Sequence, residues 1–304
     1  MLSMLVAVPL ALHHLPPPQP LPPRRRPLPQ LPASTELLGR RDWLGVGCGV
    51  CCALCGGFPA SALNALQAPP SPSKQFDAPR NAHRDESFAK MMASGMRQYE
   101  QAVAPTKARL FRRLLDKVPR SDAFIVELGM GTFPNAPYYA NAPSKAGPRR
   151  LDILGIDPND AMNEYAERAA NAAGLAALGH SVRTAHGVGE ALPLADGCAD
   201  AVVCTLTLCS VVDVKRTLQE VRRVLKPNGT FLFLEHVLSE TDPSLAKQQV
   251  LLTPLQVVSA DGCHLDRRTL QQIRAEPFTD VDADYFDLSG FYYLNPTIAG
   301  FAIA

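Results

Sequence analysis

The chain has 304 residues, of which 46% are hydrophobic and 19% charged, and its formal net charge is +1 at pH 7. This near-neutral balance provides no basic face or stripe, which argues against a nucleic-acid-binding protein. The length fits one large domain or two small ones, and the composition divides the chain unevenly near residue 65.

Residues 1–65 are predicted to be a targeting segment. They are rich in proline and poor in acids, so they cannot bury enough surface to fold. Within them, Arg40-Arg41 precedes an apolar stretch and the small residues Ala60-Ser-Ala62, which is typical of an export signal. The whole segment resembles the bipartite targeting sequences of thylakoid proteins, which predicts a chloroplast destination and a cleaved or disordered segment. A retained membrane anchor over residues 43–66 is the alternative, since that stretch is long enough for a span.

The spacing Cys48-x-x-Cys51 and Cys52-x-x-Cys55 could hold zinc or an iron–sulfur cluster, but the run has no polar or histidine neighbours. Four lie in the apolar part of the predicted signal, where small apolar residues are the preferred interpretation: Cys48, Cys51, Cys52 and Cys55. Four others show no regular framework: Cys198, Cys204, Cys209 and Cys263. We therefore expect no metal and no disulfides.

The next part is predicted as a linker, 66–86, followed by one domain, 87–304. A helical pattern covers residues 87–118, with an interruption around Pro105. Strand patterns then alternate with helical ones, with strands at 124–128, 151–156, 182–185, 200–205 and 230–234 and helices at 161–178 and 213–225. Lys226-Pro-Asn-Gly229 indicates a helix stop and turn.

The alternation predicts an α/β, Rossmann-like domain whose sheet is mainly parallel, with helices on both faces. Two further strand-like runs, 281–288 and 298–304, are joined without a helix. We expect these to be an antiparallel pair at the C-terminus of a seven-stranded sheet.

The run Ile125-Val-Glu-Leu-Gly-Met-Gly-Thr132 is typical of a strand, a glycine turn and a helix start. A dinucleotide site would have a third glycine two residues after Thr132, whereas Phe133-Pro-Asn135 follows here. Glu127 before the turn suits a cationic ligand, and Asp157 closes the next strand, where it can accept hydrogen bonds from ribose hydroxyls. A ligand with a ribose, an amino group, a sulfonium charge and no phosphate is S-adenosylmethionine. A glycine pair alone is weak evidence, and Glu127 alone could be structural.

The stretch 127–237 resembles the class I S-adenosylmethionine-dependent methyltransferases, in particular the methyltransferase type 11 group with the ubiquinone/menaquinone methyltransferases. Three motifs are more narrowly similar to the alkyl thiol methyltransferases of animals and their plant and algal relatives: Val202-Val-Cys-Thr-Leu-Thr-Leu-Cys-Ser-Val211, Glu235-His-Val237 and Asp261-Gly-Cys-His-Leu265.

The resemblance implies a class I methyltransferase fold and a cofactor site at the ends of the strands. Its cofactor-binding residues would be Glu127, Leu128, Gly129, Met130, Gly131, Asp157, Pro158, Val188, Gly189, Glu190, Thr205 and Leu206. Phe133 replaces a glycine of the family, so its ring would narrow the pocket. Val188 replaces an acid that bonds the adenine amino group in many relatives, and Glu190 is a candidate substitute.

A thiol acceptor must lose its proton before it attacks. His236, after the fifth strand, is the best candidate for a catalytic base, and Asp261 and His264 are weaker ones. The alternative is that Glu235 and His236 only brace a loop. The run 249–258 is predicted to be an apolar lid over a hydrophobic acceptor, with ordinary helix packing as the alternative.

Three functions stay open at this point. The first is methyl transfer to a small apolar acceptor such as a thiol, and the second is C- or O-methylation in quinone or prenyl-lipid metabolism. The third is a non-catalytic protein that binds the cofactor or a partner. The expected partner is a small-molecule acceptor, with no nucleic acid and no obligate protein partner. Membrane association through the N-terminal segment or an apolar substrate is also open.

Overall fold

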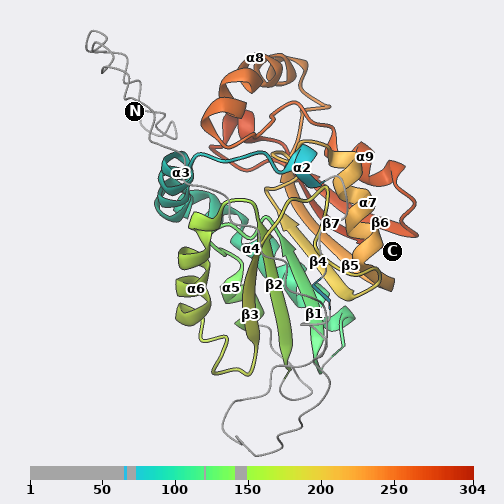
Figure 1. Ribbon diagram of the computed structural model, residues 1–304. Coiled ribbons are helices and arrows are strands. Elements are labelled where there is room, and N and C mark those ends of the chain that lie inside the picture. Colours follow the sequence, from blue (N-terminus) through green and yellow to red (C-terminus); the bar gives the residue numbers. More distant parts are fainter. Residues whose placement is uncertain (1–64, 67–72, 120, 141–148) are drawn as a thin grey trace, which may run out of the picture. The chain divides into compact units, whose positions relative to one another are not determined.

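The computed structural model describes residues 65–66, 73–119, 121–140 and 149–304 (Figure 1). Nearly all of the predicted targeting segment 1–65 and of the alternative anchor at 43–66 lies outside these residues, as do the four N-terminal cysteines. The plastid destination therefore stays a prediction. In the part of the chain that is described, no helix combines the length and apolar character needed to cross a membrane.

One seven-stranded sheet organises the domain, with the strand order β3-β2-β1-β4-β5-β7-β6. Five strands pair in parallel: β1 (Ala123–Leu128), β2 (Leu151–Asp157), β3 (Ser181–His186), β4 (Ala199–Thr205) and β5 (Leu225–His236). The last two are antiparallel, namely β6 (Asp280–Phe286) and β7 (Thr297–Ile303), and β7 lies between β5 and β6. The predicted mixed sheet is confirmed. Because strand order reverses direction between β1 and β4, a crevice is expected at the carboxyl ends of these strands.

Helices cover both faces of this sheet (Figure 1). They are α2 (Ser73–Phe76), α3 (Ala82–Gly95), α4 (Arg97–Lys117), α5 (Ala136–Ala140), α6 (Asn163–Ala172), α7 (Val214–Val224), α8 (Pro243–Ser259) and α9 (Thr269–Ala275), with short 3-10 turns η1 (Asp160–Met162) and η2 (Tyr292–Leu294). Alternate residues of β1 enter opposite cores: Val126 packs in the cluster with α7 and α9, and Ile125 in the cluster with α4, α5 and α6.

The predicted helix interruption at Pro105 is wrong, because α4 continues through it. A proline inside a helix loses one backbone hydrogen bond. Here Val103, Leu110 and Leu114 bury one face of α4 in the core, and this packing offsets the loss. The chain breaks earlier instead, at Met96 between α3 and α4.

Two other boundaries differ for reasons of backbone geometry. The helix expected over 161–178 ends at Ala172, since Gly174 adopts a left-handed φ of 68°. The turn expected at Lys226–Gly229 follows the end of α7 as predicted, but it belongs to β5. There, Asn228 has a φ of 64° and the pairing with β4 shifts register between Ala199 and Ala201.

The close packing of β7 between β5 and β6 can be tested at Gly300. A Cβ atom at this position would lie 2.0 Å from the carbonyl oxygen of Asp282 on β6. We expect Gly300→Ala to lower the free energy of unfolding by about 1–3 kcal/mol in urea denaturation, because backbone atoms must move apart. Gly95→Ala, where a Cβ meets no heavy atom within 4 Å, should leave stability equal or slightly higher. Equal stability of Gly300→Ala and the wild type would contradict this packing.

Candidate functional site

A cavity of about 520 Å³ opens at the carboxyl ends of the parallel strands. Small-molecule sites typically measure about 300–1,000 Å³. The structure brings most of the predicted cofactor residues into its wall: Leu128, Gly129, Gly131, Asp157, Pro158, Val188, Gly189, Glu190 and Leu206. Asp261 also lines it. The carboxyl ends of separate strands thus converge on one site, as the sequence predicted.

The glycine turn after β1 packs against the end of β2 and the loop after β4. Gly129 has a φ of 63° and donates its N–H to the carbonyl oxygen of Ile156 over 2.8 Å. A Cβ atom on Gly129 would lie 2.3 Å from Oγ1 of Thr207. That hydroxyl in turn donates to the carbonyl oxygen of Leu128 at 3.1 Å. Only glycine fits this position, on both conformational and steric grounds.

Asp157 orders the loops on either side of β2. One of its carboxylate oxygens accepts the N–H of Gly131 at 2.9 Å, and the other accepts the N–H of Asn159 at 2.9 Å. Burial raises the pKa of Asp157, and these two hydrogen bonds oppose the rise. Each oxygen keeps a further lone pair, so this carboxylate in the cavity wall can still accept hydroxyl donors.

Glu127 lies behind the cavity wall and does not line it. Its two oxygens accept hydrogen bonds from Asn135 Nδ2 and the Tyr139 hydroxyl, each at 2.7 Å. Burial raises the pKa of Glu127 to about 7, although both hydrogen bonds and the charge of Lys107 act in the opposite direction. The predicted contact of Glu127 with the ligand is therefore not seen in the cavity wall, and its partners Asn135 and Tyr139 are absent from the wall as well. Asn135 also donates to Thr205 Oγ1 at 3.0 Å.

Two more predicted contacts do not line the cavity. Thr205 is absent from the cavity wall, and Met130 is buried with its side chain against Gly155, where a Cβ would lie 2.2 Å from the sulfur. The expectation that Phe133 narrows the pocket is also wrong. This residue takes the left-handed φ of 59° that a glycine would adopt, and its fully buried ring packs 5.8 Å from that of Tyr139.

Glu190 holds the loop after β4 in place. Its Oε1 accepts the backbone N–H of Asp213 at 3.0 Å and that of Val212, and the residue is buried in the cavity wall beside Val188. One oxygen is therefore already engaged. The predicted contact with an adenine amino group would have to be made by Oε2, and it stays a prediction.

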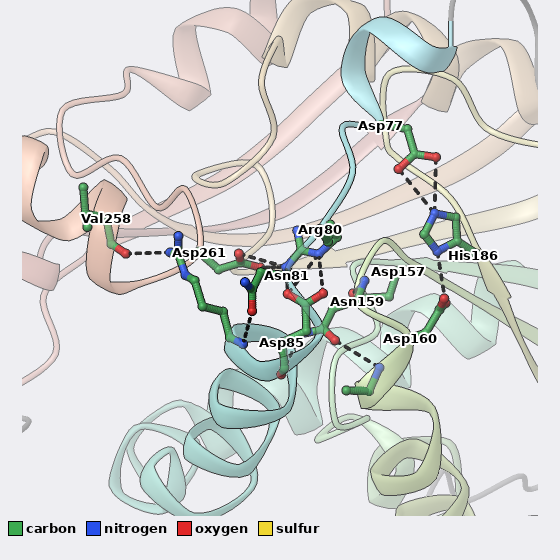
Figure 2. A network of polar contacts seen from close by, with 12 residues as sticks. Asp77, Arg80, Asn81, Asp85, Asp157, Asn159, Asp160, His186, Val258 and Asp261 are labelled. Atoms are coloured by element: carbon green, nitrogen blue, oxygen red, sulfur yellow. Dashed lines mark hydrogen bonds and ion pairs between the residues drawn. The ribbon is translucent and has the colours of Figure 1, made fainter. Parts of the chain in front are cut away.

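The wall also includes a segment that sequence reasoning missed. Residues 76–92 supply ten lining residues, although most of this stretch was predicted as a linker. Arg80 Nη2 donates to both carboxylate oxygens of Asp261 at 2.9 Å and to Asp85 at 2.8 Å, as Figure 2 shows. These partners lie up to 181 residues apart in the chain. No local pattern could reveal such pairing.

A second set of polar contacts fixes the same segment to the β2 and β3 side. His186 contacts Asp160 at 3.0 Å and Asp77 at 3.2 Å, and the Asn159 side chain donates to the Asp85 carbonyl oxygen at 3.1 Å (Figure 2). Burial lowers the pKa of His186, but the two carboxylates outweigh this and raise it. We call residues 76–92 the cover segment.

The charges of the wall favour a cationic ligand. Its ionisable side chains are five carboxylates and two guanidinium groups, namely Asp77, Asp85, Asp157, Glu190, Asp261, Arg80 and Arg84. An acidic balance of this kind attracts a sulfonium or ammonium group and repels phosphates. The wall residues thus fit a ribose-bearing sulfonium cofactor.

The loop after β4 is braced from beneath by Glu235. This buried carboxylate accepts the N–H groups of Thr207 at 2.9 Å and Leu208 at 3.1 Å through Oε1. The bracing alternative is therefore confirmed for Glu235. His236 is buried too, with Nε2 3.1 Å from Cys263 Sγ, and it is absent from the cavity wall. The prediction of His236 as a base in direct contact with the acceptor is corrected accordingly.

The predicted lid at 249–258 forms most of α8, but it does not cover the cavity. Its apolar side chains are largely exposed, with Leu251 at 78% and Val258 at 67%. The helix is anchored instead by the buried Gln249, whose amide donates to the carbonyl oxygens of Val237 and Asn295.

Comparison with known proteins agrees with this geometry. Residues 126–233 match a family model described as a methyltransferase domain. Thiol S-methyltransferase TMT1B of Rattus norvegicus is 32% identical over 202 residues, covering 65% of this chain and 78% of that protein. Thiol S-methyltransferase TMT1A of Homo sapiens is 30% identical over 210 residues, covering 67% and 81%. A Haloferax volcanii protein solved with the Trm112 methyltransferase activator shares the fold, at a TM-score of 0.51 and 16% identity, over 75% of this chain and 99% of that one.

Glu127 should make stability depend on pH. Its folded pKa of about 7 exceeds the ordinary value of 4.5, so its contribution is complete below about pH 4.5 and is lost as pH rises through 7. Relative to Glu127→Gln, we expect the wild type to lose on the order of 3 kcal/mol of unfolding free energy across this window in urea denaturation. The exposed Glu167→Gln is the control and should show little change. A difference between wild type and Glu127→Gln that is constant with pH would contradict the buried, protonatable carboxyl.

Proposed function

The chain belongs to the class I S-adenosylmethionine-dependent methyltransferases, and on that premise we propose that its acceptor is a small apolar thiol. We infer the acceptor class from the similarity to two mammalian proteins named thiol S-methyltransferases. This similarity extends over about four fifths of their length. It is longer than the stretch 126–233 that matches the methyltransferase family model.

The residues at the carboxyl ends of the strands would bind the cofactor. S-adenosylmethionine, when bound, supplies an electrophilic methyl group on a sulfonium sulfur. The Gly129–Gly131 turn allows close approach of a ligand to the backbone, and Asp157 can accept hydrogen bonds from its ribose. The acidic wall complements the positive charge of the ligand. The protein thus contributes position and electrostatic complementarity rather than bond-breaking chemistry of its own.

The loop after β4 forms the wall next to the expected acceptor. Leu206, Val211 and Val212 give it an apolar surface, with Ser210 between them. Attack of a thiolate on a sulfonium converts two opposite charges into neutral products, so an apolar, water-poor site does not oppose the reaction. The same surface favours acceptors that carry an alkyl chain.

An acceptor screen with the full-length chain tests this function. We expect S-adenosylhomocysteine to form with alkyl thiols, with kcat/KM rising up to about fourfold for each added methylene, since burying one contributes about 0.8 kcal/mol. Hydroquinones and phenols are the competing acceptors. Methylation of these compounds without any thiol product would overturn the thiol proposal and favour a quinone or prenyl-lipid methyltransferase.

Gly129 tests the cofactor site separately from the acceptor. We expect Gly129→Ala to weaken S-adenosylhomocysteine binding at least about tenfold in calorimetry, because the new Cβ collides with Thr207 and disturbs the turn. Gly174→Ala is the matched control, as Gly174 also has a positive φ, of 68°, but a Cβ there meets no heavy atom within 4 Å. Equal losses in the two variants would mean that backbone strain alone explains the effect.

A further inference from the structure

Three side chains of metal-binding type meet just behind the cavity wall. Cys209 lies in the loop after β4, His236 ends β5, and Cys263 lies in the loop after α8. One ligand atom from each lies within 4.8 Å of the other two. All three residues are buried, with exposed fractions of 3%, 3% and 7%.

The spacing of these atoms suits a single tetrahedral ion. Ligand atoms that share one zinc ion through bonds of about 2.3 Å to sulfur and 2.0 Å to nitrogen lie roughly 3.5–3.8 Å apart. In the structure, His236 Nε2 is 3.1 Å from Cys263 Sγ, and the whole set stays within 4.8 Å. Small side-chain movements therefore bring all three atoms to bonding distance of one centre.

The polar contacts of the cluster are mainly among its own three members. Cys209 interacts with both Cys263 and His236, and its contacts with the Leu206 carbonyl oxygen and the Ser210 hydroxyl are long, at 3.6 Å each. His236 Nδ1 is buried and has no hydrogen-bond partner among the residues that the structure describes. Nε2 is the ring nitrogen that lies 3.1 Å from Cys263 Sγ, so it is the histidine atom placed to share a ligand with the two thiols, and Nδ1 would then carry the ring proton.

The backbone around the cluster is firmly held. The N–H of His264 donates to the Cys209 carbonyl oxygen at 2.8 Å, and a Cβ on Gly262 would lie 2.9 Å from the Ser210 carbonyl oxygen. Arg267 adds a hydrogen bond of 2.6 Å to the Val211 carbonyl oxygen. The two loops that carry the cysteines are thus fixed to each other before any ion arrives.

We propose that Cys209, His236 and Cys263 bind one Zn²⁺ ion. Two thiolates and an imidazole are a soft ligand set that zinc accepts readily. This inference replaces the sequence-based expectation of no metal. That expectation rested on the apolar context of the N-terminal cysteines and on the irregular spacing of the other four, and His236 and Cys263 lie 27 residues apart.

Three protein ligands leave the fourth position of the ion open, as in catalytic zinc sites. Leu206, Ser210 and Gly262, the neighbours of the two cysteines, all line the cavity. In a step that rests on the proposed function, the acceptor thiol takes this position and releases its proton to water. A sulfur lone pair then forms the new bond to the methyl carbon, and the broken carbon–sulfur pair stays on the departing S-adenosylhomocysteine.

Metal content and affinity test the site. In full-length chain carrying C48S, C51S, C52S and C55S, we expect one zinc per chain by mass spectrometry. The variants Cys209→Ser and Cys263→Ser should weaken zinc binding at least about 100-fold, because even outer partners of ligands are worth 10–100-fold. Cys204→Ser is the matched control, since Cys204 is equally buried but lies outside the cluster. Unchanged zinc binding in both cluster variants, or copper in place of zinc, would overturn the proposal.

Cobalt substitution gives a readout on the unaltered cluster, so a variant that fails to fold does not decide the matter. Co²⁺ bound here should show the intense visible bands of a tetrahedral thiolate site, and an alkyl thiol should shift them. Absence of these bands in folded protein that still binds S-adenosylhomocysteine would refute the metal site. Thiol methylation by zinc-free protein would refute a role of the ion in the reaction and would leave the proposed function intact. Bands that a thiol does not shift would refute the acceptor's place on the ion.

Discussion

Carboxylates buried beside the strand ends are the constraint on which the site depends. Asp157, Glu190 and Glu235 each accept two backbone N–H groups from loops that follow the strands. A buried carboxylate without such partners is strongly unfavourable, so each loop is confined to conformations that keep its amide groups in place. The cavity keeps its shape because these carboxylates hold its loops, and two of them, Asp157 and Glu190, line the cavity themselves.

This arrangement explains which parts of the site the sequence could predict. The strands, the glycine turn and Asp157 follow from local patterns, because strand period, φ requirements and the ends of parallel strands are properties of short segments. The orientation of a side chain at a strand end is not such a property. Glu127 and Met130 belong to the predicted turn, yet both turn into the core, where Asn135 and Gly155 receive them.

The remainder of the site depends on contacts between distant residues. The cover segment meets Asp261 from 181 residues away, and the cysteine–histidine cluster joins three elements that share no motif. Pro105 shows the same limit in the fold, since packing of α4 outweighs a local helix-breaking signal. The cavity wall formed by the strand ends is thus predicted largely by local sequence, whereas the wall formed by the cover segment and Asp261 depends on tertiary structure.

The ion pair between Arg80 and Asp261 makes one edge of the cavity wall sensitive to ionic strength. It joins the cover segment to the loop between α8 and α9, and both residues line the cavity. Partly exposed ion pairs of this kind contribute only about 0–1 kcal/mol each, and salt screens them further. Raising the salt concentration therefore weakens a contact between two parts of the wall that lie 181 residues apart in the chain.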